Sequence, residues 1–276
     1  MIKRILVGLA GTHYTPVAIR TAVELARARQ AELTGVTVVD VARLSHVGPV
    51  PLGAECAAEE LREHRLQLTA QRVEEVTSEF ESACTAAGVA YRVAREEGDA
   101  FRKMLAYSRY HDVTVFGLRG VFEYCFEEDD SCSVLARLVE GGVRPILAVS
   151  EQYRPIRRVL IAYSGSVESA NTFREFIQLG PWPDLTLRLV TFGEHDEGGE
   201  KLMDDAARYF RACGLDPETE HVPGSAKDQL LPYAEACSAD MIVLGNSARS
   251  YLLKRLFGET ALNAMQNADR PLFLHQ

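Results

Sequence analysis

A stretch near the carboxyl end of the chain, GNSARSYLLKRLFGET (residues 245–260), contains residue types that could bind phosphate. It follows the apolar run MIVL, which is typical of a buried strand, and Gly245 stands where that strand would end. Gly258 and the nearby hydroxyl of Thr260 stand where the pattern predicts the start of a helix. Glycines let backbone amides approach an anion closely, and a helix N-terminus carries partial positive charge. The stretch therefore predicts a phosphate-binding loop between a strand and a helix.

The elements that must position this loop occur twice, because four segments repeat in the same order. KRILVGLAGT (residues 3–12) reappears as RRVLIAYSGS (157–166), and AELTGVTVVD (31–40) as PDLTLRLVTF (183–192). HDVTVFG (111–117) reappears as ADMIVLG (239–245), and VRPILAVS (143–150) as DRPLFLHQ (269–276). Repeats at this distance indicate a tandem duplication. The polar segment EQYRP between the copies is typical of a linker, so we expect domains at residues 1–150 and 151–276.

Each half alternates short β-branched runs with longer helical patterns. In the first half we expect strands at residues 4–9, 33–39, 90–95, 113–117 and 146–149, and helices at 16–31, 57–87, 100–110 and 134–140. Near-continuous apolar strands separated by helices indicate a parallel sheet that is covered on both faces. The sequence therefore predicts an α/β fold made of two repeated five-stranded parallel-sheet α/β sandwiches.

The two halves are expected to differ in two places. The second helix of the second half is shorter and lies near residues 198–213. The first half carries an additional segment at residues 41–57, whose prolines and glycines predict a loop. This loop is either a lid over the strand ends or a plain surface excursion.

Composition excludes several classes of function. The net charge of −9 argues against general nucleic-acid binding, which needs a basic surface. No segment approaches the roughly 20 apolar residues that span a bilayer, and the basic-then-apolar start is typical of a strand rather than a secretory signal. We therefore expect a cytoplasmic protein. The cysteines and histidines are dispersed without a CxxC pair, so no metal site is predicted. His46, Cys56 and His64 are the one combination left open.

The strand, glycine turn, helix start and closing Arg-Pro strand resemble the universal stress protein family, here in its tandem two-domain form. The resemblance covers nearly the whole chain. It implies a Rossmann-like, adenine nucleotide alpha hydrolase-like fold. It also implies a phosphate signature of Gly, two residues, Gly, nine residues, then Gly followed by Ser or Thr. Members of the family divide into ATP binders and non-binders, so the resemblance implies a stress-response protein that acts by binding, with at most weak ATPase activity.

Compared with this signature, the second half keeps the spacing but changes two residues. Ala248 replaces the second glycine, and Glu259 stands where the family has a hydroxyl, which Thr260 could supply one place later. A carboxylate about 4 Å from an anion opposes binding by ~4 kcal/mol at an effective dielectric near 20. A magnesium ion, rotation of the side chain into solvent, or a shorter ligand such as AMP would avoid this repulsion. Alternatively, Glu259 only stabilises a helix N-terminus.

The resemblance implies further contacts around the nucleotide. Ser164 stands where the family has an aspartate that holds adenine, and Val190 stands where backbone groups meet the base. Arg249 follows the turn and either neutralises phosphate charge or is an ordinary exposed helix residue. The predicted ligand is ATP or AMP with Mg²⁺ in the C-terminal domain, without catalytic residues. The predicted binding residues are Ser164, Val190, Gly245, Ala248, Arg249, Gly258, Glu259 and Thr260.

The first half departs further from the signature. Ala10 replaces the adenine aspartate, and Gly117 and Gly120 keep the turn. The loop is two residues too long and ends in Cys132 and Ser133. Unpaired acids would repel a triphosphate, and this loop contains Glu127, Glu128, Asp129 and Asp130. We therefore expect no ATP binding in the first half.

Two other functions stay open. SGSVES (residues 164–169) resembles the pyrophosphatase loop SGGxDS of ATP-dependent amide- and thiol-transfer enzymes, although Ser166 and Glu168 depart from it and the segment is also a typical helix start. The chain could instead be a scaffold that has lost both nucleotide sites. Its apolar closing strands invite pairing. By analogy with family dimers, the two halves should meet through these strands as a pseudo-twofold unit, and a further homodimer is compatible with this arrangement.

Overall fold

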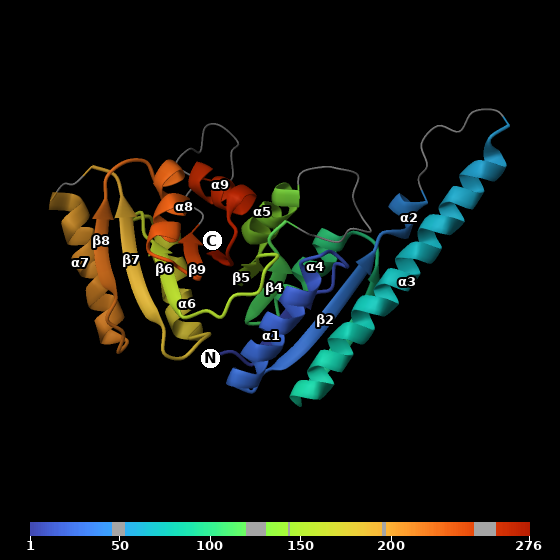
Figure 1. Ribbon diagram of the computed structural model, residues 1–276, viewed down its shortest axis with the longest axis horizontal. Coiled ribbons are helices and arrows are strands. Elements are labelled where there is room, and N and C mark those ends of the chain that lie inside the picture. Colours follow the sequence, from blue (N-terminus) through green and yellow to red (C-terminus); the bar gives the residue numbers. More distant parts are fainter. Residues whose placement is uncertain (46–52, 120–130, 143, 195–196, 246–257) are drawn as a thin grey trace.

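The computed structural model describes residues 1–45, 53–119, 131–142, 144–194, 197–245 and 258–276 (Figure 1). The strands of the first half are β1 (Arg4–Gly8), β2 (Glu32–Val39), β3 (Tyr91–Glu97), β4 (Val113–Gly117) and β5 (Ile146–Val149). Its helices are α1 (Thr15–Arg29), α2 (Val41–Leu44), α3 (Glu55–Ala87), α4 (Ala100–Ser108) and α5 (Ser131–Gly141).

The second half repeats this succession of strands and helices. Its strands are β6 (Arg158–Ala162), β7 (Thr186–Phe192), β8 (Glu218–Val222), β9 (Met241–Gly245) and β10 (Leu272–His275). Its helices are α6 (Val167–Leu179), α7 (Glu197–Ala212), α8 (Ala226–Ala236) and α9 (Glu259–Asn267). The predicted α/β class is confirmed.

The strands form one hydrogen-bonded sheet in the order β3-β2-β1-β4-β5-β10-β9-β6-β7-β8. Within each half, all neighbouring strands run parallel and follow the same order, counted from the first strand of that half. Among the strands of the described residues, only β5 and β10 pair antiparallel, with Leu147 opposite Phe273. The predicted five-stranded parallel arrangement of each half is confirmed, and the two halves are joined edge to edge through β5 and β10. The repeated strand order and the single antiparallel joint are what a duplicated unit produces when its closing strands pair.

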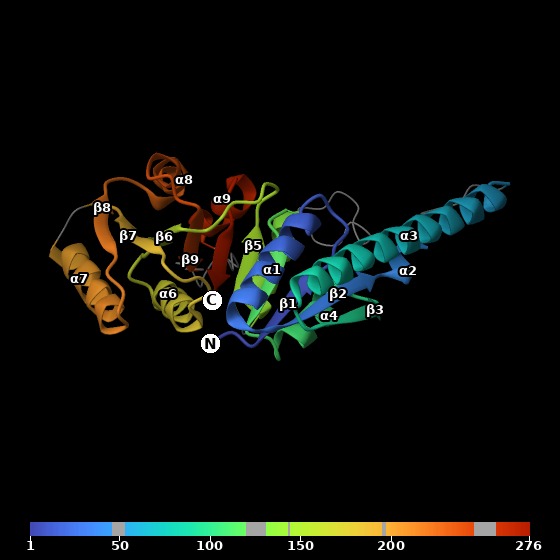
Figure 2. The same cartoon turned by 60° about the horizontal axis from the view of Figure 1, so that its bottom comes forward.

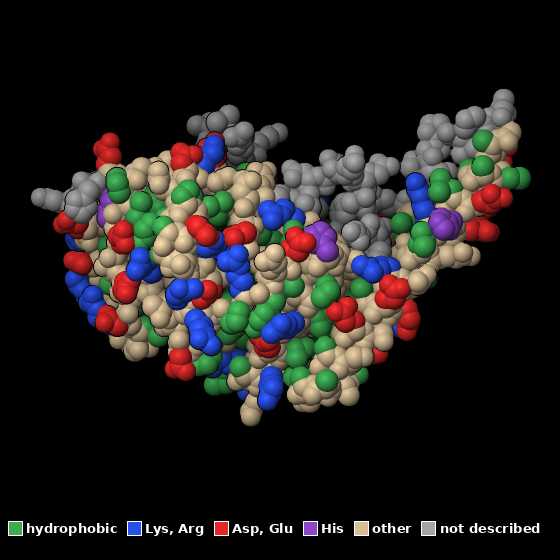
Figure 3. Space-filling view, in the orientation of Figure 1, with side chains coloured by type: hydrophobic (Ala, Val, Ile, Leu, Met, Phe, Trp, Pro, Cys, Tyr) green, Lys and Arg blue, Asp and Glu red, His purple; other side chains and the backbone are tan. Residues whose placement is uncertain are grey.

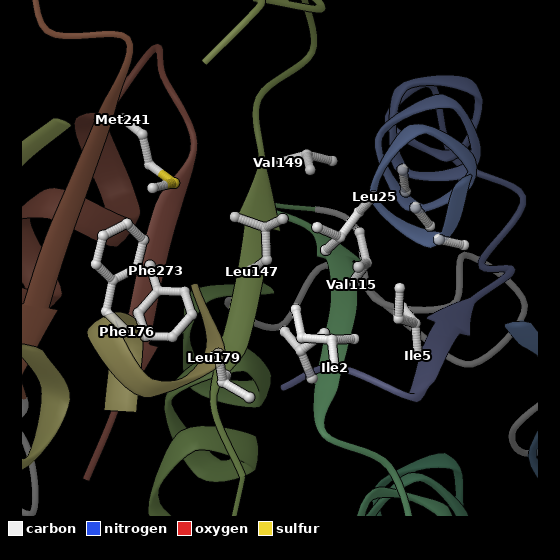
Figure 4. Close-up of a cluster of buried hydrophobic side chains, with 14 of the residues drawn as sticks. Ile2, Ile5, Leu25, Val115, Leu147, Val149, Phe176, Leu179, Met241 and Phe273 are labelled. Carbon is white, nitrogen blue, oxygen red and sulfur yellow. The ribbon is translucent and has the colours of Figure 1, made fainter. Parts of the chain in front are cut away.

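Helices cover both faces of the sheet, and the apolar core on each face runs through both halves. Helices α1, α3, α6 and α7 contribute to one core cluster, while α4, α5, α8 and α9 contribute to the other. Figure 2 shows α8 on one side of the second-half strands, with α6 and α7 on the other. Figure 4 shows Leu147 of β5 between first-half side chains such as Ile2 and second-half side chains such as Phe273.

The two halves also share a pair of hydrogen bonds at the start of the sheet. Oδ2 of Asp112 accepts the backbone N–H groups of Lys3 and Arg4 at 2.6 and 2.9 Å. Oδ2 of Asp240 accepts those of Arg157 and Arg158 at 3.0 and 2.8 Å. Each aspartate directly precedes the fourth strand of its half and holds the start of the first strand beside it.

Helix α3 is the largest difference between the halves. It begins at Glu55, two residues before the predicted start, and ends at Ala87 as predicted, where Gly88 closes it with a φ of 65°. The residues of α3 before Thr69 are not buried, and Figures 1 and 2 show this part extending beyond the rest of the molecule. The segment at residues 41–57, predicted as a loop, begins with the short helix α2, and residues 46–52 lie outside the described part.

Candidate functional site

The candidate site lies at the carboxyl edge of the second-half strands. Ala162, the last residue of β6, pairs with Leu244 of β9 and with Val190 of β7. Ser164, two residues after β6, and Gly245, the last residue of β9, are therefore close neighbours. Helices α6, α8 and α9 follow β6, β8 and β9, so their N-termini face the same edge, which is where parallel α/β sheets bind ligands.

Gly245 brings β9 into direct contact with the first turn of α6. A Cβ atom at this position would lie 2.6 Å from Cα of Ser169 and 2.8 Å from the backbone oxygen of Glu168. Neither atom can move without shifting the helix. The sequence interpretation of Gly245 considered phosphate only, whereas this helix–strand contact requires a glycine by itself.

Three serine hydroxyls cluster where β6 leads into α6. Oγ of Ser164 lies 3.1 Å from Oγ of Ser166 and 3.2 Å from that of Ser169, and the latter two are 3.2 Å apart. Ser166 is the N-cap of α6, and its Oγ accepts the backbone N–H of Ser169 at 3.1 Å. Ser164 is exposed while Ser169 is buried. Helix capping thus accounts for the SGSVES segment, and Ser164 is the hydroxyl that a ligand can reach.

The start of α9 carries the final part of the predicted phosphate loop. Gly258 is the N-cap of this helix, and Glu259 lies in its first turn. A carboxylate oxygen of Glu259 lies 3.2 Å from Nζ of Lys227, in the first turn of α8. Both side chains are largely exposed. Glu259 would repel an anion. The ion pair with Lys227 and the partial positive charge at the N-terminus of α9 offset part of this repulsion.

Val190, predicted near the base, is fully buried. Its carbonyl oxygen accepts the backbone N–H of Tyr163 at 2.8 Å, so this oxygen already has a donor within the sheet. Burial is the main cause that raises the pKa of Tyr163, with a smaller contribution from Asp205, so this phenol stays protonated at neutral pH. Ala248 and Arg249 lie outside the described residues, as do Gly120 and the acidic residues 127–130.

In the first half, the residues that correspond to the predicted adenine end are packed inside the protein. Ala10 is buried, and so is Tyr14. Nε of Arg72, from α3, donates to the backbone oxygen of Gly11 at 2.9 Å. Gly117 is the last residue of β4. Cys132 and Ser133 lie in the first turn of α5, which begins at Ser131.

Arg119 and Lys227 are residues near these loops that the sequence interpretation missed. The guanidinium of Arg119 donates to the backbone oxygens of Gln266 and Ala268, the latter at 3.2 Å, and so reaches the end of α9 in the other half. Its Nε also donates to the hydroxyl of Tyr14 at 3.2 Å. In the sequence, Gly117 and Gly120, on either side of Arg119, indicate only a glycine turn. Neither contact leaves a local pattern, because the partners are far apart along the chain.

The groups at this edge are suited to binding an anion. They comprise exposed and half-buried hydroxyls, a lysine and three helix N-termini. Among the described residues, no group of three or more His, Cys, Asp or Glu side chains is placed to hold a metal ion. Within the same part of the chain, no helix combines the length and apolar character of a membrane span. On the face shown in Figure 3, acidic and basic side chains are interspersed.

Comparisons with known proteins identify one family. The sequence model of the Universal stress protein family matches residues 1–119 and 194–274. A universal stress protein from Archaeoglobus fulgidus DSM 4304 has a similar crystal structure, with a TM-score of 0.67, 16% identity, and coverage of 99% of this chain and 98% of that chain. The crystal structure of a universal-stress-type protein from Pseudomonas aeruginosa UCBPP-PA14 gives a TM-score of 0.63 at 17% identity. This match covers 99% of this chain and 93% of that chain. At such identities the likeness shows the fold alone. No curated protein matches the chain.

Proposed function

Because the chain belongs to the universal stress protein family, we propose that it is a regulatory protein of the stress response that acts by binding. Its C-terminal half binds an adenine nucleotide, ATP or AMP with Mg²⁺, and its N-terminal half does not. The two halves form the intramolecular counterpart of a family dimer through β5 and β10. A homodimer of the whole chain and a cytoplasmic location stay predictions.

The extent of the family match carries this proposal. Its second segment, residues 194–274, includes the complete spacing from Gly245 to Thr260. Its first segment ends at residue 119, just before the long acidic loop of the first half. The match therefore continues through the loop in which the phosphate spacing is intact and stops at the loop in which it is lost.

The described geometry supports the same half. The N-terminus of α9 begins at its N-cap Gly258, and backbone N–H groups at a helix N-terminus bind phosphate oxygens. The Thr260 hydroxyl adds a donor beside them. Lys227 faces Glu259 and reduces the negative charge near the helix start. Ser164 lies at the base end with an exposed hydroxyl, and Ala248 and Arg249 belong to the loop between β9 and α9.

A titration of the purified full-length chain with ATP and AMP, with and without Mg²⁺, tests the proposal. Calorimetry and thermal shift should both show binding, without release of ADP or pyrophosphate. Thr260→Val should weaken binding about tenfold, because it removes a hydrogen bond to a charged group. Glu259→Gln should strengthen ATP binding more than AMP binding, since the carboxylate opposes terminal phosphates. Ser133→Ala changes the position of the first half that corresponds to Glu259. It is the matched control and should not change nucleotide binding.

Two outcomes would contradict the proposal. No stabilisation at millimolar ATP or AMP would leave the scaffold as the better description, and the contact between Gly245 and α6 favours that alternative because it explains the glycine without a ligand. Release of pyrophosphate would instead favour an enzyme that uses the serine-containing loop.

A further inference from the structure

A cavity lies at the joint of the two halves, away from the candidate nucleotide site. Its volume is about 570 Å³, within the range of small-molecule sites. Its walls come from α1, from the segment that enters β6, and from the segment that enters β7. The last two segments lie at the amino ends of their strands, whereas the candidate nucleotide site lies at the carboxyl ends.

One wall of this cavity is held in place by Tyr153. The guanidinium carbon of Arg20 lies 3.5 Å from the centre of the Tyr153 ring. The Tyr153 hydroxyl donates to Glu24 at 2.5 Å, and the other oxygen of Glu24 accepts Nε of Arg20 at 3.1 Å. Burial is the main cause that raises the pKa of Tyr153, so it remains a donor at neutral pH. The linker is thereby fixed to α1, and this wall exists before any ligand arrives.

Two arginines that line the cavity have hydrogen-bond donors to spare. Arg154 uses one side-chain N–H toward Asp269 at 2.9 Å, out of the five that a guanidinium carries. Within the described part of the chain, Arg157 forms hydrogen bonds through its backbone, and its side chain makes no hydrogen bond or ion pair. The charge of Glu24 in the lining is paired with Arg20, and Asp184 is the other carboxylate that lines the cavity. Arginine forks bind carboxylates and phosphates in bidentate geometry, so the cavity favours an anion.

The remaining lining is flat and apolar. Trp182 is half-buried and packs against the core, and two prolines and an isoleucine continue this surface. Such a surface next to two arginines suits a planar ring that carries a negative group. We propose that this cavity binds a small aromatic anion, with its ring on Trp182 and its carboxylate or phosphate at Arg157 and Arg154. Such a ligand would contact α1 of the first half and the start of β7 in the second, and would stabilise their joint.

The chain offers a direct readout, because Trp182 is its only tryptophan. The full-length protein is titrated with benzoate and with phenyl phosphate while tryptophan fluorescence and the thermal midpoint are followed. Benzyl alcohol and benzamidine serve as neutral and cationic ligands with the same ring. We expect saturable fluorescence changes and a raised midpoint for the anions, with about tenfold weaker binding of the alcohol. The stronger of the two anions identifies the group that the arginines prefer.

Variants separate this site from general charge effects. Arg157→Gln should weaken anion binding about tenfold. Arg208→Gln, which changes an exposed arginine on α7, is the matched control and should bind normally. Trp182→Phe should lose the fluorescence signal but keep the thermal shift. Thr260→Val, in the candidate nucleotide site, should not change the binding of benzoate or phenyl phosphate. The result at the cavity therefore does not depend on whether the nucleotide site binds a ligand. The inference is overturned by non-saturable signals, by benzamidine binding as well as the anions, or by full affinity in Arg157→Gln.

Discussion

At the scale of residues, the duplicated Arg-Pro sequences place an arginine in two different environments. Arg270 is 3% exposed, and its guanidinium donates to the backbone oxygens of Ala234 and Ala239 at 2.8 and 2.9 Å, at the end of α8. It also pairs with Glu235 and Asp269. Its counterpart Arg144 is exposed and forms an ion pair with Glu175 at 3.6 Å. The second copy therefore uses its arginine to close a helix, and the first does not.

Replacing the two arginines should show this difference. We expect Arg270→Leu to lower the free energy of unfolding by about 2–4 kcal/mol, because two buried carbonyls lose their donors. The matched change Arg144→Leu should cost less than about 0.5 kcal/mol, as for other exposed ion pairs. Urea denaturation of both variants measures these values. Equal losses would show that burial of Arg270 contributes nothing.

Asp240 gives a prediction about pH. Partial burial acts to raise the pKa of Asp240, but hydrogen bonds from Arg158 and from the backbone of Arg157 hold it below its ordinary value overall. The pKa is thus lower in the folded than in the unfolded protein. The resulting stabilisation is present above the unfolded pKa of about 3.9 and is lost as pH falls through the folded value. Asp240→Asn should therefore lower the unfolding free energy by about 1–2 kcal/mol at pH 7.

The pH series that checks this compares the variant with the wild type in urea denaturation from neutral pH downward. The difference in unfolding free energy should shrink below pH about 4. Asp216→Asn, at a carboxylate that is 87% exposed, is the control and should leave stability unchanged at every pH. A difference between wild type and Asp240→Asn that stays constant with pH would contradict the proposed role of the charge.

At the scale of elements, β9 packs directly against the backbone of α6 because Gly245 has no side chain. Gly245→Ala would place a methyl group 2.6 Å from the backbone of Ser169, which must then move. Overpacking of this kind costs about 1–3 kcal/mol. We expect that loss in thermal or urea unfolding without any ligand, together with weaker protection of α6 amides in hydrogen exchange. Ser164→Ala, at a neighbouring exposed hydroxyl, should cost much less. An unaffected Gly245→Ala variant would return the glycine to a role in ligand binding alone.

The positions of individual helices and strands are also what the sequence predicted best. Apolar periodicity places α1, the long α3 and the buried strands within a few residues of their observed bounds, since each pattern is local. The closing strands were correctly expected to meet. The short helix α2 was missed because residues 41–57 are rich in turn formers. The contacts of Arg119 with α9, of Lys227 with Glu259 and of α6 with Gly245 join residues distant in the chain, so no spacing indicates them. The nucleotide-binding role of the predicted residues stays a prediction.

At the scale of the whole molecule, the halves share both cores. Leu147 of β5 and Phe273 of β10 lie opposite each other at the joint, and each is 1% exposed. Phe273 also contacts Phe176 of α6, with ring centres 5.2 Å apart and nearly perpendicular planes. Arg29 and the N-terminal amine further bond to backbone oxygens of the second half, at 3.3 Å each. The boundary predicted between residues 150 and 151 stays a prediction, and the packing of the two halves crosses it.

A shared core predicts that the molecule unfolds as one unit. Phe273→Ala should lower the free energy of unfolding by about 3–5 kcal/mol, as for other buried phenylalanines, whereas Tyr110→Ala, at a side chain 73% exposed, should change it by less than about 0.5 kcal/mol. Trp182 fluorescence reports the second half and far-ultraviolet circular dichroism reports both, so their urea transitions should coincide in wild type and variant. Hydrogen exchange should accelerate to the same degree in β2 and β7, although β2 lies far from the substitution. Faster exchange confined to β7, or two separated transitions, would show that each half is stable by itself and that the joint only holds them together.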